Sequence, residues 1–105
     1  MPARHEGYIV VTGTAEKEGK QFVSYCREMG TSSCGDTAEE ALGNLEDAID
    51  VHLKALMETG ELLRFLQERN IFIHRKPLRD ELLVLVPPGK PFVAYQRPVG
   101  LAEPV

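Results

Sequence analysis

The side chains of this chain that could carry out covalent or acid–base chemistry are few. The 105 residues include two cysteines and three histidines. Cys26 is the candidate nucleophile, because the adjacent Arg27 could lower the pKa of its thiol and favour the thiolate. A thiol packed in the interior is the competing and favoured interpretation. His52 falls among the apolar residues of a predicted helix, where a histidine at the edge of the core is favoured over a catalytic base.

The two cysteines, Cys26 and Cys34, are eight residues apart on what the sequence predicts to be neighbouring strands. A disulfide across the hairpin is one alternative, but two free, half-buried thiols are favoured in a reducing cytosol. A zinc site that combines these thiols with His5, His52 or His74 is another alternative. Its spacings match no recognised ligand pattern.

The usual sequence signatures of enzymes are missing. The chain has no Gly-rich phosphate loop before a helix, no Gly-x-Ser-x-Gly elbow and no His-Glu-x-x-His zinc helix. A two-metal nuclease would need carboxylates on strands that point into a shared pocket. The predicted strands at 8–14 and 21–27 contain none. We therefore expect a protein that is not an enzyme and holds no cofactor, with a nuclease or thiol enzyme using Cys26 as the least favoured alternative.

The acidic residues gather in one part of the chain. Between residues 36 and 61, Lys54 is the one Lys or Arg. An acidic helix face suits either solvent or a basic protein partner, and it argues against contact of that face with nucleic acid. The acids of this segment are Asp36, Glu39, Glu40, Glu46, Asp47, Asp50, Glu58 and Glu61.

A second charged segment, residues 64–79, is basic. Such a patch could contact phosphate groups of a nucleic acid, although a solvated surface is the favoured interpretation. The weak candidates for nucleic-acid contact are Arg64, Arg69, Arg75 and Lys76.

The most regular element is an amphipathic helix predicted over residues 37–58. Thr37 can accept a hydrogen bond from the backbone of Glu40, which caps a helix start, and Gly60 supplies the left-handed residue that ends helices. Apolar residues at three- and four-residue steps line one face. They include Ala38, Ala41, Leu42, Leu45, Ala48, Ile49, Leu53 and Leu56.

The other elements follow from runs of β-branched and aromatic residues separated by turn residues. We expect an α+β fold, in which a three-to-four-stranded sheet packs on the long helix, with a short second helix and extra C-terminal strands. The predicted strands are 8–14, 21–27, 31–34, 71–75, 82–86 and 92–96, the short helix is 61–69 and ends at Asn70, and Pro98 to Val105 is a loose tail.

The chain has no apolar run of the ~18–20 residues that a membrane span needs, and its first residues lack the apolar core of a signal peptide. We therefore expect a cytoplasmic protein. Five consecutive apolar residues at 82–86 need covering, inside the fold or by a second copy of the chain. This favours a homodimer or homotetramer built through the C-terminal strands.

Residues 25–42, with the sequence YCREMGTSSCGDTAEEAL, resemble the HicB-type antitoxin domain. The resemblance continues through Asn44-Leu45 and Ala48-Ile49 to Leu53, and it covers about residues 6–76. It rests on an aromatic-Cys strand end, a strand of small residues that closes in Gly-Asp-Thr, and an amphipathic helix that starts at Glu-Glu-Ala.

This resemblance implies a β-β-β-α-β fold, similar to a trimmed ribonuclease H without its catalytic carboxylates. It also implies an antitoxin of a type II toxin-antitoxin system, which binds a small basic HicA-type mRNA-cleaving toxin and covers its active site. Complementary charge speeds such an encounter. The candidate toxin contacts are Glu46, Asp47 and Asp50.

The resemblance divides the chain into a HicB-like domain at 1–76 and a strand-rich C-terminal extension at 77–105, which we expect to form oligomer contacts. Many family members carry a DNA-binding domain at this end. Residues 77–105 depart from that pattern, because they are rich in proline and glycine and include no second long helix. The alternative function is therefore a solitary HicB-like interaction or regulatory module without a toxin partner.

Overall fold

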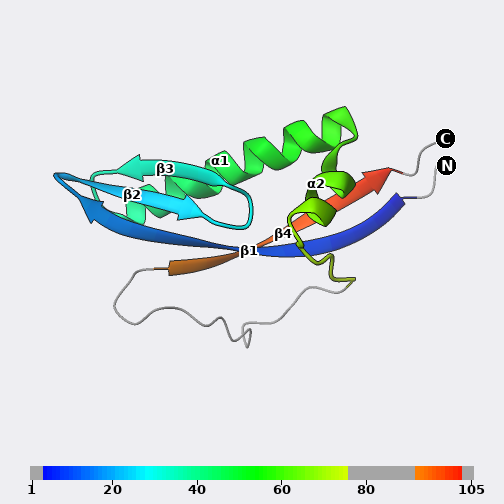
Figure 1. Cartoon of the computed structure of the whole chain (residues 1–105), viewed down its shortest axis with the longest axis horizontal. Helices are drawn as coiled ribbons and strands as arrows, with labels where there is room; N and C mark the ends of the chain where they lie inside the picture. Colours follow the sequence, from blue (N-terminus) through cyan, green and yellow to red (C-terminus); the bar gives the residue numbers. More distant parts are fainter. Residues whose placement is uncertain (1–3, 76–91, 103–105) are drawn as a thin grey trace.

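A four-stranded antiparallel sheet packs one face against a long helix (Figure 1). The structure is a computed structural model, and it describes residues 4–75 and 92–102. This arrangement confirms the predicted α+β fold. The strand order in the sheet is β3-β2-β1-β4. The elements are β1 (Arg4–Glu18), β2 (Gln21–Cys26), β3 (Thr31–Gly35), α1 (Ala38–Thr59), α2 (Leu62–Glu68) and β4 (Phe92–Ala102).

Helix α1 begins and ends within one residue of its predicted bounds. The Thr37 side chain accepts a hydrogen bond from the Glu40 N–H at 3.0 Å, which satisfies one of the free donors at the helix start. Gly60 adopts a left-handed conformation with φ of 74° and ends the helix. The residues of α1 buried against the sheet are Ala41, Leu42, Leu45, Ile49, Leu53 and Leu56.

Strand β1 is longer than the predicted strand at 8–14. Ile9, Val11 and Ala15 are buried on the face that meets α1, as alternation along a strand requires. Residues 14–18 pair with β2, and residues 4–14 pair with β4 on the other side. The end of β1 that pairs with β2 was not predicted as strand, because its charged residues have low strand propensity. Pairing with β2 overrides that propensity.

One edge of β1 continues beyond the end of β2. There the Glu28 carboxylate accepts hydrogen bonds from the Thr12 N–H at 2.9 Å and from the Thr12 hydroxyl. Further along, His74 exchanges two backbone hydrogen bonds of 2.7 Å with Tyr8. The prediction of a full strand at 71–75 is wrong, because the segment forms only this isolated bridge.

The fourth strand of the sheet is β4, for which the sequence predicted 92–96 alone. The predicted tail from Pro98 is wrong as far as residue 102, since the strand runs through the proline. Pro98 lies opposite Tyr8, whose backbone groups point to His74 on the far side of β1. The Pro98 nitrogen therefore points away from β1, where its missing N–H removes no bond from the β1–β4 ladder.

Strand β4 comes from the C-terminal extension predicted at 77–105 and pairs along β1. This part of the extension therefore belongs to the same sheet as β1 to β3. The predicted strand at 82–86, with the oligomer contact expected there, lies outside the described residues. The boundary at residue 76 stays a prediction.

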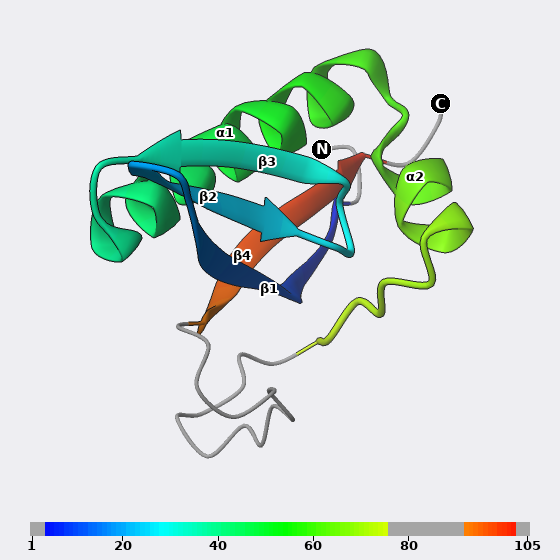
Figure 2. The same ribbon diagram turned by 60° about the vertical axis from the view of Figure 1, so that its left-hand side comes forward.

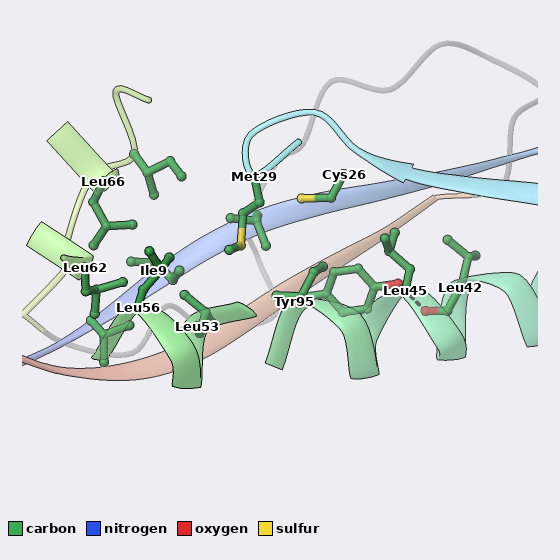
Figure 3. Packing of buried hydrophobic residues seen from close by; sticks show 14 of the residues in the cluster. Ile9, Cys26, Met29, Leu42, Leu45, Leu53, Leu56, Leu62, Leu66 and Tyr95 are labelled. Atoms are coloured by element: carbon green, nitrogen blue, oxygen red, sulfur yellow. Dashed lines mark hydrogen bonds between the residues drawn. The ribbon is translucent and has the colours of Figure 1, made fainter. Parts of the chain in front are cut away.

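The apolar core lies between α1 and the sheet, and α2 packs beside the C-terminal half of α1 (Figures 2 and 3). Helix α2 confirms the predicted short helix, and Asn70 follows it with a φ of 57°. The largest fully buried side chains are Ile9, Val11, Ser24, Cys26, Met29, Leu45, Ile49, Leu62 and Leu66.

Three hydrogen bonds tie the first half of α1 to the strands, and we call them the anchoring bonds. Two of their donors are buried hydroxyl groups, which would be costly to leave without a partner. The Tyr95 bond is visible in Figure 3. The anchoring bonds run from Ser24 Oγ to the Ala41 carbonyl (2.7 Å), from Tyr95 Oη to the Leu42 carbonyl (2.8 Å) and from Asn44 Nδ2 to the Cys34 carbonyl (2.8 Å).

Candidate functional site

Helix α1 turns one face away from the sheet (Figure 2), and the sequence predicts an acidic surface there. Most acidic residues between positions 36 and 61 are exposed, and Lys54 is exposed among them. These carboxylates therefore face solvent. The exposed acids are Asp36, Glu39, Glu40, Asp47, Asp50, Glu58 and Glu61.

Arg97 of β4 occupies two of the three predicted toxin contacts. Its Nε donates to Asp50 Oδ1 at 2.6 Å, and its Nη2 donates to Glu46 Oε1. Partial burial acts to lower the pKa of Arg97, but the hydrogen bonds with Asp50 and Glu46 outweigh it, so the pKa is raised. Glu46 and Asp50 therefore share one internal cation, which ties α1 to β4.

Asp47, the third predicted contact, is exposed and turns away from this cluster. Within the described segments, no hydrogen bond or ion pair involves its carboxylate. The structure thus separates the three predicted residues, with Glu46 and Asp50 on the side of α1 nearest β4 and Asp47 on the outside. Asp47 is the one whose charge is fully available to a partner.

Two of the four predicted nucleic-acid contacts, Arg64 and Arg69, interact with other residues of the chain. Arg64 forms an exposed ion pair with Glu68 at 3.0 Å, and the bond to Glu68 raises the pKa of Arg64. The Arg69 guanidinium lies 5.4 Å from the centre of the Phe65 ring, in a cation–π contact. Arg75 is exposed. Lys76 lies outside the described residues, so contact with nucleic acid stays a prediction.

His52 lies at the edge of the core, which was the favoured interpretation. Its Nδ1 is 3.4 Å from the Thr31 hydroxyl, and its ring meets the edge of Phe65 with the centroids 5.1 Å apart. The side chain is half-buried between α1, α2 and the start of β3. These contacts account for the histidine as a packing residue.

Cys26 is a packed thiol. Its side chain is fully buried, and burial, with the Glu28 charge as a weaker cause, raises the pKa of Cys26 to about 11. The thiol is therefore protonated at neutral pH and poorly suited to nucleophilic attack. Arg27 does not lower this pKa, contrary to what its position in the sequence suggested.

Cys34 is exposed, and both cysteines are free. Cys34 lies opposite Val23, whereas Cys26 lies opposite Thr31, so the two side chains point to opposite faces of the sheet. A disulfide between them is excluded by this geometry. Neither thiol is half-buried as predicted, since one is fully buried and the other exposed.

Among residues 4–75 and 92–102, no group of three or more His, Cys, Asp or Glu side chains is placed to hold a metal ion. In the same part of the chain, no helix is both long enough and apolar enough to cross a membrane.

Three residues of this surface were not predicted from the sequence. Arg97 fell between the predicted strand at 92–96 and the predicted tail from Pro98, and nothing in its neighbourhood signals a contact with a helix some fifty residues earlier. Gly43 and Val51 lie on the outer face of α1, both exposed. Gly43 could have been singled out from the sequence, because an isolated glycine weakens a helix and so calls for a packing or functional reason.

Comparison with known protein families, curated protein sequences and solved structures gives no match for this chain.

Proposed function

We propose that this chain is a HicB-like antitoxin, which binds a small basic mRNA-cleaving toxin and covers its active site. The observation that carries the proposal is the exposed acidic face of α1, with Lys54 as its one Lys or Arg between positions 36 and 61. Such a surface attracts a basic protein at long range and selects against acidic ones.

The rigidity of α1 supports the same proposal. The anchoring bonds and the Arg97 ion pairs fix the helix to three strands of the sheet. A surface that is already ordered loses little conformational entropy when a partner binds, so more of the contact energy appears as affinity.

The first part of the element order is consistent with the resemblance, because three antiparallel strands precede the long capped helix. The further strand of the sheet, β4, lies beyond residue 76, outside the part of the chain that the resemblance covers. The packed state of Cys26 and the edge-of-core position of His52 favour a binding role over a thiol-dependent reaction.

The experiment is a growth-rescue assay with a small basic protein encoded beside this chain. We expect that protein to arrest growth alone and to become harmless when the chain is expressed with it. The variant Asp47→Lys should weaken the purified complex on the order of tenfold. Glu18→Lys is the matched control and should bind normally, because Glu18 is exposed and strand alternation turns it to the face of the sheet away from α1.

Failure of the wild-type chain to rescue growth or to form a complex would overturn the proposal.

The pairing of Glu46 and Asp50 with Arg97 favours the alternative, a solitary HicB-like module, because it removes two acids from partner binding. Gentle purification from the native host separates the two readings. A basic companion in fixed ratio supports the antitoxin, and the chain alone supports the solitary module. Light scattering on the same sample checks the predicted homodimer or homotetramer.

A further inference from the structure

Three residues of α1 lie at four-residue steps along the side opposite the core, and we call Gly43, Asp47 and Val51 the outer stripe. Successive residues are turned by 100° about the helix axis, so Gly43 and Val51 point within about 40° of the direction of Asp47. The buried Leu45 and Leu56 point about 160–180° away from that direction. All three stripe residues are exposed.

Gly43 has no explanation within the described part of the chain. A Cβ added at this position would meet no atom within 4 Å, and the backbone has no positive φ that would call for glycine. By contrast, a Cβ at Gly13 would lie 2.7 Å from the Leu45 side chain, and one at Gly35 would lie 2.6 Å from the Ala41 nitrogen. Those two glycines make room for α1, but Gly43 makes room for nothing among residues 4–75 and 92–102.

Glycine in the interior of a helix makes the helix less stable than alanine would. The neighbours of Gly43 are held firmly, because Leu42 and Asn44 both take part in anchoring bonds. The chain therefore presents a flat, rigid and destabilising position in the second turn of α1, on its outer face. Such a position allows the backbone of another molecule to approach closely.

Val51, two turns further along, is 69% exposed. A single exposed apolar side chain is ordinary, but this one stands in line with Gly43, about 12 Å along the helix axis. Asp47 lies between them, and its carboxylate is not held by Arg97. The outer stripe thus presents a position without a side chain, a carboxylate and an apolar side chain in succession along the helix.

We infer that the outer stripe is the contact centre for a basic protein partner. The partner's chain, most compactly a helix, crosses α1 at Gly43, places an apolar side chain against Val51 and sets a Lys or Arg against Asp47. The basic chemistry follows from the charge of the surrounding helix surface, where Glu40 and Glu58 flank the stripe and Lys54 is the one Lys or Arg between positions 36 and 61. This inference rests on the proposed function for the identity of that partner.

The test uses the full chain and the purified basic protein encoded beside it, in a graded series at one position. Gly43→Ala and Gly43→Gln should both raise the urea midpoint of unfolding, because they remove a helix-weakening glycine. The same variants should weaken the complex, about tenfold for Ala and a hundredfold for Gln, as the added side chains block close approach. A rise in fold stability with a fall in affinity cannot come from a purely structural role.

The matched control is Met57→Gln, which places the same new side chain on α1 but about 80° away from Asp47, at an exposed position. It should leave the affinity unchanged. Val51→Asp should weaken the complex at least as strongly as Gly43→Gln.

Three outcomes would overturn the inference, and they differ from one another. If the wild-type chain binds while Gly43→Gln binds equally well, the contact centre lies elsewhere and the proposed function stands. If the wild-type chain does not bind, the proposed function is wrong, and the inference then has no basic partner to place on the stripe. If light scattering gives a wild-type oligomer that Gly43→Gln converts to monomer, the stripe is an interface between copies of this chain.

Discussion

The Tyr95 hydroxyl donates a 2.8 Å hydrogen bond to the backbone carbonyl of Leu42, joining two residues that are 53 positions apart in the sequence. It is buried, and it links the last strand of the sheet to the first turns of α1. Burial, with the Glu46 charge as a lesser cause, raises the pKa of Tyr95, so the phenol keeps its proton at neutral pH. The surface proposed to bind the partner is therefore held in place by the C-terminal strand.

Tyr95→Phe should lower the free energy of unfolding by about 1 kcal/mol, the usual net contribution of one buried hydrogen bond. Urea denaturation followed by circular dichroism measures the change. Tyr25→Phe is the control, since Tyr25 is 46% exposed on the other face of the sheet and should change stability by less than about 0.5 kcal/mol. Equal losses in the two variants would contradict a specific role for the bond.

Gly13→Ala should lower the free energy of unfolding by about 2 kcal/mol, because the added methyl group overpacks the core. Its Cβ would lie 2.7 Å from both the Leu45 Cδ2 and the Tyr95 Cε2. Gly43→Ala is the paired control, and it should gain about 0.5–1 kcal/mol. Thermal denaturation of both variants, in parallel with the wild type, shows whether each substitution lowers or raises the stability. A neutral Gly13→Ala would mean that α1 can move away from the sheet at little cost.

Arg97→Met should lower the free energy of unfolding by about 1 kcal/mol, a value discounted because both carboxylate partners are nearly half exposed. Two acids one helical turn apart would then repel each other without their shared cation. The difference from the wild type should shrink in 1 M salt, because salt screens exposed charges. A difference that persists unchanged in high salt would assign the loss to packing of the arginine stem instead.

The free energy of unfolding should fall as the pH rises from about 9 to 11, on account of Cys26. The folded pKa of about 11 lies above the ordinary value of 9.0, so the folded state holds a proton that the unfolded state has released. Stability from this source is complete below pH 9 and is lost as the pH passes through 11, up to about 3 kcal/mol. Urea titrations at pH 8 and pH 10.5 measure it.

Cys26→Ala supplies the control for this pH dependence. The variant should be less stable at pH 8, yet its loss between pH 8 and pH 10.5 should be smaller than that of the wild type. The raised pKa of Tyr95 contributes a residual slope of the same sign. An identical slope in the variant would remove Cys26 as a cause.

The long helix could be predicted from the sequence because its signals are local. The cap at Thr37, the left-handed Gly60 and the spacing of the leucines lie within one continuous segment. Strands β2 and β3 and helix α2 follow from similarly local signals of turn residues and apolar spacing.

Strand β4 could not be predicted beyond residue 96, because the reason that it tolerates Pro98 lies elsewhere. The backbone of Tyr8 bonds with His74, and this leaves the proline nitrogen on the outer edge of the sheet. The same error hid Arg97 and its bond to Asp50, a contact across 47 positions. The acidic surface itself was visible in the sequence, but the division between Asp47 and its two paired neighbours required the structure.

Pro98 also limits how the sheet can grow. A strand that is added along the outer edge of β4, from this chain or another, finds no N–H donor at the proline, so a continuous ladder cannot run the length of that edge. Residues 92–96 remain able to template a short pairing, whereas the full strand is a poor seed for edge-to-edge aggregation. The proline that breaks the pattern of a strand in the sequence thus removes one hydrogen-bond donor from the outer edge of the folded sheet.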